Sequence, residues 1–170
     1  MGATIKILSR SLSSALLVVA LGALTGCGAG RAMIIQPPET KLRASSAEFS
    51  EGKSPVSVPV EVKSALQGKL SEFLYAEGNG FKKGSELKIV YRFIQYDPGS
   101  QLTRWFWGGI GNAGEGSLTI ETKYFDGANK ELATIHTEGR IGSGFFGGDF
   151  NFAIEKAAEK MAEYAINNFK

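Results

Sequence analysis

The chain of 170 residues contains one cysteine, Cys27, so no disulfide bond can form within it. The part of the chain from Cys27 onward has 144 residues, a length that suits one compact domain with its own core. Because no covalent cross-link is possible, the burial of apolar side chains must supply the stability. The spacing of apolar residues along the chain is therefore what decides the fold.

The residues before Cys27 are typical of an export signal. Lys6 and Arg10 give a positively charged start, and the apolar run over 15–24 is about ten residues long, too short to span a bilayer. The end of this run resembles the lipobox of bacterial lipoproteins. The residues that carry this resemblance are Leu24, Thr25, Gly26 and Cys27.

The lipobox resemblance implies that the thiol of Cys27 carries acyl chains and that this residue becomes the amino terminus. In such lipoproteins an Asp after the cysteine retains the protein in the inner membrane, and this chain has Gly28 there. For a Gram-negative source we therefore expect the periplasmic face of the outer membrane, reached through an N-terminal lipid, in preference to the inner membrane. The alternative is an ordinary signal peptide cut beside a free thiol.

The domain organisation follows from this cut. Residues 1–26 are the predicted signal peptide, 27–40 a lipidated tether and 41–170 a single domain. The tether contains two glycines and two prolines and is expected to reach on the order of 20 Å. Its apolar residues at 33–35 are expected to lie on the domain or among lipid headgroups.

The balance of basic and acidic residues argues against a nucleic-acid partner. Two of the 19 basic residues lie in the signal peptide, which leaves 17 basic against 17 acidic residues. A nucleic-acid-binding protein would show a clustered basic excess, so we expect no nucleic-acid partner.

Two segments have the apolar period of a helix. The first, over 59–75, has Ser57 as a candidate cap, and its apolar face consists of Val62, Leu66, Leu70 and Phe73. The second covers 149–168, and its predicted buried stripe consists of Ile154, Ala158, Met161 and Ala165. Ion pairs are expected on its wet side between Lys156 and Glu159 and between Lys160 and Glu163.

The remaining segments predict strands. Residues 41–49 alternate weakly, and 86–96 are apolar on both alternating faces, which is typical of a central strand. Residues 117–125 and 130–141 flank a turn at 126–129 and predict an antiparallel hairpin. The order strand, helix, three strands, helix predicts an α+β two-layer sandwich, in which an antiparallel sheet of about four strands carries both helices on one face.

Several of these features together resemble the bacterial lipoprotein family known as domain of unknown function 4410. They are the lipobox, the helix that ends near Gly78 with Phe81 after it, Arg104 followed by the glycine-rich run 111–116, the turn at 126–127, and Gly147–Gly148 before the last helix. The resemblance supports the fold and the location, and it implies no activity and no cofactor.

Catalytic and cofactor motifs are weak. The run 142–147 matches G-x-G-x-x-G, but a second strand bearing an acidic residue cannot follow in the 23 residues that remain. The glycine cluster over 108–114 leads into a strand instead of a helix. His136 is the single histidine and is predicted on a solvent-facing strand side with Thr134, Glu138 and Arg140. We therefore predict no metal site, no cofactor and no catalytic triad.

The strongest candidate contact is aromatic. Both tryptophans fall in one predicted 18-residue connection, over 98–115, and long connections are often functional. Arg and Trp are enriched at binding hot spots, and Trp also favours membrane interfaces. The candidate contact residues are Arg104, Trp105, Phe106 and Trp107. The alternative is that these rings fold back over the end of the sheet.

Three functions stay open at this point. The first is a non-catalytic, lipid-anchored envelope lipoprotein that offers its sheet edge or aromatic loop to an envelope protein, in assembly, transport or maintenance. The second is a carrier of a small molecule or lipid, which requires a solvent-open cleft between helices and sheet. Its expected lining is Tyr91, Phe93, Tyr124 and Phe125. The third is an enzyme of unknown type.

Overall fold

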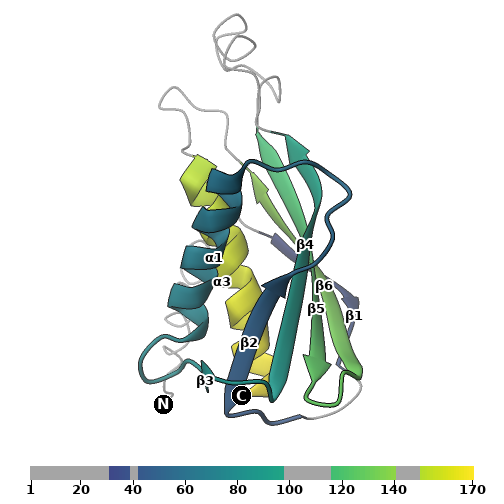
Figure 1. Ribbon diagram of the computed structural model, residues 1–170, viewed down its shortest axis with the longest axis vertical. Helices are drawn as coiled ribbons and strands as arrows, with labels where there is room; N and C mark the ends of the chain where they lie inside the picture. The colour runs from purple at the N-terminus through teal and green to yellow at the C-terminus, as the bar shows by residue number, and fades with distance from the viewer. Residues whose placement is uncertain (1–30, 39–41, 98–115, 141–149) are drawn as a thin grey trace, which may run out of the picture.

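The computed structural model describes residues 31–38, 42–97, 116–140 and 150–170 (Figure 1). These ranges contain six strands and two helices. They are β1 (Arg31–Gln36), β2 (Ser46–Glu51), α1 (Val60–Leu74), β3 (Lys82–Lys83), β4 (Leu87–Asp97), β5 (Ser117–Asp126), β6 (Glu131–Arg140) and α3 (Phe150–Phe169).

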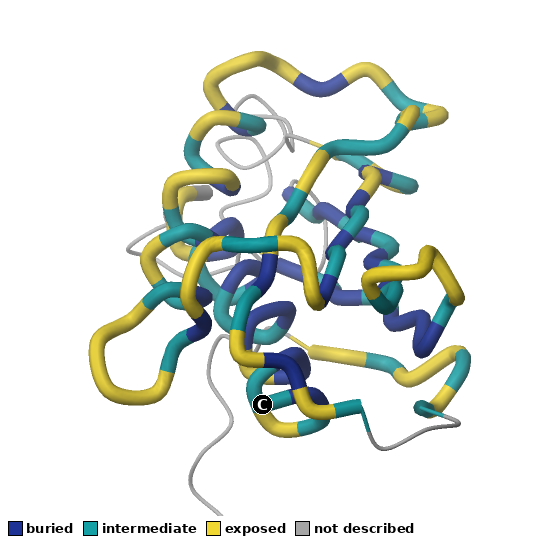
Figure 2. Tube along the Cα trace, turned by 60° about the horizontal axis from the view of Figure 1, so that its bottom comes forward, coloured by how far each residue is buried: buried dark blue, intermediate teal, exposed yellow. Residues whose placement is uncertain are grey.

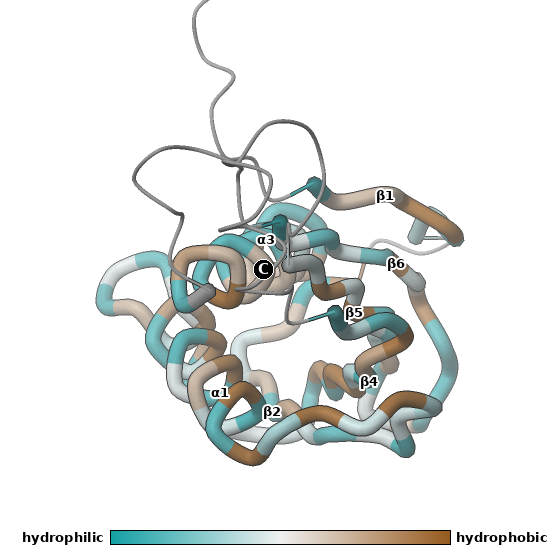
Figure 3. The backbone as a smooth tube through the Cα atoms, turned by 90° about the horizontal axis from the view of Figure 1, so that it is seen from above, coloured by the Kyte–Doolittle hydropathy of each residue, from teal (hydrophilic) through white to brown (hydrophobic). Residues whose placement is uncertain are grey.

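The strands form one mixed sheet in the order β1-β6-β5-β4-β2-β3. Pairing is antiparallel from β1 through β4, whereas β2 runs parallel to both β4 and β3. Both helices lie on one side of this sheet, as the view from above shows (Figure 3). The α+β class is confirmed. The prediction of about four antiparallel strands was wrong, because α1 carries the chain back along the sheet, so that β4 starts at the same end as β2.

The segment predicted as a tether contributes β1. Five of its residues pair with β6, from Arg31 opposite Glu138 to Gln36 opposite Thr134, with an irregularity between Ile34 and Gln36. Residues 31–36, which the sequence assigned to the tether, are therefore part of the sheet. Its apolar residues lie on the domain, which was one of the two expected positions, but Ile34 and Ile35 stay exposed there.

Helix α1 forms as its apolar period predicts. Its buried residues are Val62, Leu66, Leu70 and Leu74. Leu74 takes the place expected for Phe73, which is only partly buried. Pro59 occupies the cap position and no side chain caps the helix, so the assignment of Ser57 as the cap was wrong. Gly78 follows with φ of 86°, a left-handed conformation that costs glycine little and that turns the chain toward β3.

Helix α3 buries all four residues of its predicted stripe, together with the small side chains between them. The short side chains at Ala157, Ala158 and Ala165 allow this helix to approach the sheet and α1 closely. Both predicted ion pairs form, with Nζ to Oε2 distances of 2.6 Å from Lys156 and of 2.6 Å from Lys160. The helix is thus apolar toward the sheet and charged toward water.

The core fills the space between the two helices and the sheet, where the buried positions in Figure 2 gather. Its largest fully buried side chains include Tyr91, Phe93, Tyr124 and Phe169. The rings of Tyr124 and Phe169 lie 5.5 Å apart between their centroids. The hydroxyl of Tyr124 is satisfied there, since it donates to the Met161 carbonyl oxygen at 2.9 Å.

The predicted hairpin of β5 and β6 is confirmed. Its turn is held by the carboxylate of Asp126, which accepts hydrogen bonds from the backbone N–H groups of Ala128 at 2.9 Å and Lys130 at 2.8 Å. Asn129 adopts φ of 66°, a conformation that asparagine tolerates in turns.

Candidate functional site

The face of the sheet opposite the helices carries the polar groups. Along β5, the residues Leu118, Ile120, Thr122 and Tyr124 are buried toward the helices, and the residues between them point the other way. We call this second surface the polar face. It consists of Lys88, Arg92, Gln95, Asp97, Ser117, Thr119, Glu121, Lys123, Glu131, Thr134, His136, Glu138 and Arg140, with Val90 and Phe125 as apolar members.

Three side chains from adjacent strands meet at the centre of the polar face. The register places Glu121 of β5 opposite Arg92 of β4 on one side and opposite His136 of β6 on the other. Arg92 Nε donates to Glu121 Oε1 at 2.7 Å, and His136 Nε2 lies 3.3 Å from Glu121 Oε2. The side chain of Glu121 is only 14% exposed, so its charge is held by two partners in a partly dry position.

The electrostatics of this cluster favour an ionised carboxylate. The hydrogen bond from Arg92 lowers the pKa of Glu121 below its ordinary value, and the contact with His136 acts in the same direction, while burial opposes both. A carboxylate with a lowered pKa has no proton to donate near neutral pH and is a weak base. The cluster therefore holds a carboxylate charge between Arg92 and His136.

A second carboxylate is arranged in a similar way near the hairpin turn. Lys123 Nζ lies 2.9 Å from Glu131 Oε2, and the Thr134 hydroxyl donates to Glu131 Oε1 at 2.6 Å. The hydrogen bond from Lys123 is the main cause of a lowered pKa at Glu131. The polar face is thus a surface of paired charges with hydroxyl groups among them.

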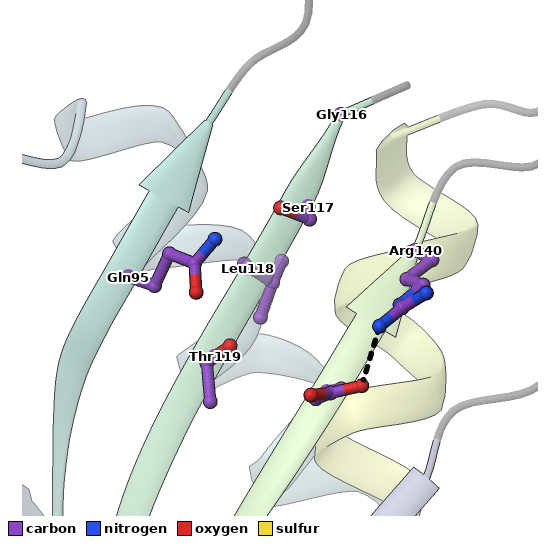
Figure 4. A pocket seen from close by; sticks show the side chains of 7 residues that line it. Gln95, Gly116, Ser117, Leu118, Thr119 and Arg140 are labelled. Carbon is purple, nitrogen blue, oxygen red and sulfur yellow. Dashed lines mark hydrogen bonds and ion pairs between the residues drawn. The ribbon is translucent and has the colours of Figure 1, made fainter. Parts of the chain in front are cut away.

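A shallow hollow of about 190 Å³ lies at one end of the polar face (Figure 4). Side chains from three strands border it, with Gln95 from β4, Thr119 from β5 and Arg140 from β6. Arg140 forms an ion pair with the neighbouring Glu138 at 3.2 Å, which the dashed line in Figure 4 marks. The complete lining is Gln95, Gly116, Ser117, Leu118, Thr119, Glu138 and Arg140. An amide, two hydroxyl groups, a carboxylate and a guanidinium therefore point at one space.

The predicted aromatic contact Arg104, Trp105, Phe106 and Trp107 lies outside the described residues. In the sequence it connects β4 to β5, whose ends Asp97 and Ser117 are paired in the sheet beside the hollow. Cys27, the lipobox and both glycine-rich runs, over 108–114 and 142–147, also fall outside the described ranges. Those predictions stay as they were made.

His136 takes the position that the sequence predicted, on the same face of β6 as Thr134, Glu138 and Arg140. The sequence reasoning missed its partners, Glu121 and Arg92, because neither lies on the same strand. The alternation within each predicted strand was the available signal, since it placed Glu121 on one face of its strand. The register between strands was needed to bring the three side chains together.

The cleft expected of a carrier is absent from the described part of the molecule. Tyr91, Phe93 and Tyr124 are fully buried in the packed core, and Phe125 points to the opposite face of the sheet. Tyr91 is further fixed by a hydrogen bond from Gln67 Nε2 to its hydroxyl oxygen at 2.9 Å. These rings stabilise the domain and do not line an open cavity.

The described ranges contain neither a metal-binding cluster nor a membrane-spanning helix. No three histidine, cysteine or carboxylate side chains gather there in a way that could hold a metal ion. No helix in these ranges has the length and apolar character needed to cross a membrane.

Comparison with known protein families identifies the family of the domain. The family described as "Domain of unknown function (DUF4410)" matches residues 31–144, which begin at β1 and include the whole polar face. The chain belongs to this family. A match that starts at residue 31 agrees with β1 being part of the DUF4410 domain and not of a separate tether. No curated protein matches the sequence.

Among solved structures, the DUF4410 chain is similar to a PelC dodecamer from Paraburkholderia phytofirmans, with a TM-score of 0.58 and 7% sequence identity. The likeness covers 83% of this chain and 99% of that one. A variant of the same PelC dodecamer aligns with a TM-score of 0.47 and 10% identity, over 78% and 97% of the two chains. At such identities the likeness to PelC shows a shared fold and nothing more.

Proposed function

We propose that the mature chain is a lipid-anchored, non-catalytic lipoprotein of the cell envelope, which presents the polar face of its sheet to another envelope component. The role belongs to assembly, transport or maintenance of the envelope. The proposed location is the periplasmic face of the outer membrane. This location is inferred from the lipobox and from Gly28.

The observation that carries this proposal is the polar face itself. One side of the sheet is occupied by the helices, and the other presents paired charges, hydroxyl groups and the hollow at Gln95, Thr119 and Arg140. Surfaces with many directed polar groups give specificity and orientation to a partner. The perturbed carboxylates Glu121 and Glu131 are each explained by ion pairs within the face, so they require no catalytic role.

The likeness to PelC adds a second line of support. PelC has the same fold and is a dodecamer, so a domain of this kind can serve as a building block of an assembly. For this chain the partner is then either a second copy or a different envelope protein. The carrier alternative finds no support in the described residues, because the aromatic side chains it needs are core.

Site-specific photocrosslinking in living cells tests the proposal. A photoreactive amino acid replaces Gln95, which is exposed beside the hollow, and the matched control replaces Glu72, which is exposed on α1 on the far side of the molecule. We expect one dominant protein adduct from the Gln95 position and none from the Glu72 position. Mass spectrometry then identifies the partner as a second copy or a different protein.

The lipid-free variant Cys27→Ser completes the design. Mislocalisation should abolish the adduct at Gln95 if the partner is met at the membrane. Equal adducts from both positions, or none from Gln95, would contradict the use of the polar face. A retained small molecule without any protein adduct would favour the carrier instead.

A further inference from the structure

Strand β1 lies at the edge of the sheet and contributes little to the core. It pairs with β6 on one side, and none of its residues is buried. Ile34 and Ile35 are 59% and 54% exposed, and the pairing with β6 is irregular between Ile34 and Gln36, so strict alternation of side chains is interrupted there. An exposed apolar edge with unpaired backbone groups is a liability that proteins normally cover. Within the described residues nothing covers the outer side of β1.

The position of β1 in the chain indicates what covers it. This argument rests on the proposed function, in which Cys27 carries the lipid. Arg31 begins the strand four residues after Cys27, and four residues span at most about 14 Å when fully extended. The isoleucines follow at about 3.3 Å per residue. The edge therefore cannot move far from the bilayer surface to which Cys27 would be attached.

The chemistry of β1 suits a lipid interface. Arg31 is exposed at the start of the strand, and the strand itself has no acidic residue, so it complements lipid phosphates. The unpaired N–H and C=O groups of an edge strand require water or other polar partners, which the headgroup layer supplies and the hydrocarbon core does not. The two isoleucines then cover their exposed area against the boundary between headgroups and acyl chains.

We propose that β1 lies against the membrane surface, with Ile34 and Ile35 in the headgroup region, so that the sheet stands on this edge. The partner of β1 is a lipid surface and not a second polypeptide. The plane of the sheet is then roughly perpendicular to the membrane, and the polar face is accessible to a neighbouring envelope component. The β2–β3 edge is the part of the sheet farthest from the lipid.

Fluorescence quenching of the full-length, lipidated protein tests this orientation. Lipid on the Cys27 sulfur leaves an introduced thiol as the single site for a fluorescent label. The test variant is Ile35→Cys, and the matched control is Ser50→Cys, an exposed position on β2. Four strand spacings separate β1 from β2, a distance of about 19 Å at 4.8 Å per spacing. Each labelled protein is placed in vesicles of phosphatidylethanolamine and phosphatidylglycerol.

Two quenchers report on the two environments. We expect a headgroup-attached nitroxide to remove at least about half of the fluorescence at position 35, because interfacial groups sit within about 10 Å of the headgroup boundary. Aqueous iodide should quench it weakly. Position 50 should show the reverse pattern. A second variant, Ile34→Cys, replaces Ile35→Cys if the latter loses the helical circular dichroism of the parent.

The outcomes separate the inference from the proposed function. Intact mass and vesicle flotation establish first whether the protein is lipidated and bound, and failure there overturns the proposed function. A lipidated, bound protein whose position 35 is quenched by iodide as strongly as position 50 overturns the membrane contact. Protection of position 35 from both quenchers also overturns it, because a second polypeptide must then cover the edge.

Discussion

A pair of glycine-to-alanine substitutions should move the stability of this domain in opposite directions. Gly139 lies on the helix-facing side of β6, where the first turn of α3 comes closest. A Cβ atom added there would lie 2.4 Å from the carbonyl oxygen of Ala153. Gly68 lies in the exposed middle of α1, and a Cβ added there would meet nothing within 4 Å.

The magnitudes follow from these two environments. The obstacle at Gly139 is helix backbone, which cannot rotate away, so either α3 or β6 must shift, at a cost of about 1–3 kcal/mol. At Gly68 the alanine removes backbone freedom from the unfolded chain and improves helix propensity by about 1 kcal/mol. For a domain of this size 1 kcal/mol moves the melting temperature by about 3 °C. We therefore expect Gly139→Ala to lower it by about 3–9 °C and Gly68→Ala to raise it by about 3 °C.

Thermal and urea unfolding, followed by circular dichroism, measure both changes in otherwise identical protein. The Gly68 variant controls for the general effect of replacing glycine, since both variants add the same methyl group. If Gly139→Ala melts at or above the parent temperature, α3 does not approach β6 as closely as the structure has it. The packing argument for the helix layer would then be refuted.

Four further predictions concern the polar face, the core, the anchor and the aromatic segment. Glu121→Gln should lower the stability at pH 7 by about 1 kcal/mol in urea unfolding, because it removes a partly screened carboxylate that is paired with the Arg92 guanidinium and in contact with the His136 ring. Because folding lowers the pKa of Glu121, the stability that its carboxylate contributes is present above the unfolded pKa and is lost as the pH falls through the folded pKa. The parent should therefore lose more stability than the variant on acidification. Parallel pH profiles of the two proteins would contradict this. Tyr124→Phe should cost about 1 kcal/mol in the same assay, since a buried carbonyl loses its donor, and an unchanged midpoint would show that the hydrogen bond is not formed. Cys27→Ser should abolish incorporation of labelled palmitate and release the protein from the membrane fraction, whereas a variant that remains acylated would rule out this attachment site. Trp105→Ala combined with Trp107→Ala should weaken the envelope interaction at an unchanged melting temperature; a large drop in melting temperature would mean that the rings belong to the core.

Much of the architecture was predictable because it is recorded in contiguous residues. The apolar period in α1 and α3 is a local property of each segment, and both helices formed within one or two residues of their predicted ends. The hairpin of β5 and β6 was predictable for the same reason, since the turn chemistry at Asp126 lies between its strands. The family resemblance rested on the same local features, and it is confirmed over 31–144.

The errors concern relations between segments that are distant in the chain. The strand alternation in β2 was visible in part, but its parallel direction depends on how α1 packs back across the sheet. Strand β1 was missed because two glycines and two prolines dominate its surroundings, and its pairing energy comes from β6, about one hundred residues later. Propensity alone cannot report such a partner.

The central cluster on the polar face shows this division most clearly. The sequence by itself determined that Glu121 and His136 would face away from the core, because side chains alternate along a strand. Only the tertiary structure decided that Arg92, Glu121 and His136 would meet, since they come from three strands and lie 29 and 15 residues apart. The register between β4 and β5 shifts at Phe93–Gln95, and an irregularity of one residue changes which side chains are neighbours. Alternation is a property of each strand alone, whereas register is fixed only when the strands pack together against a shared core.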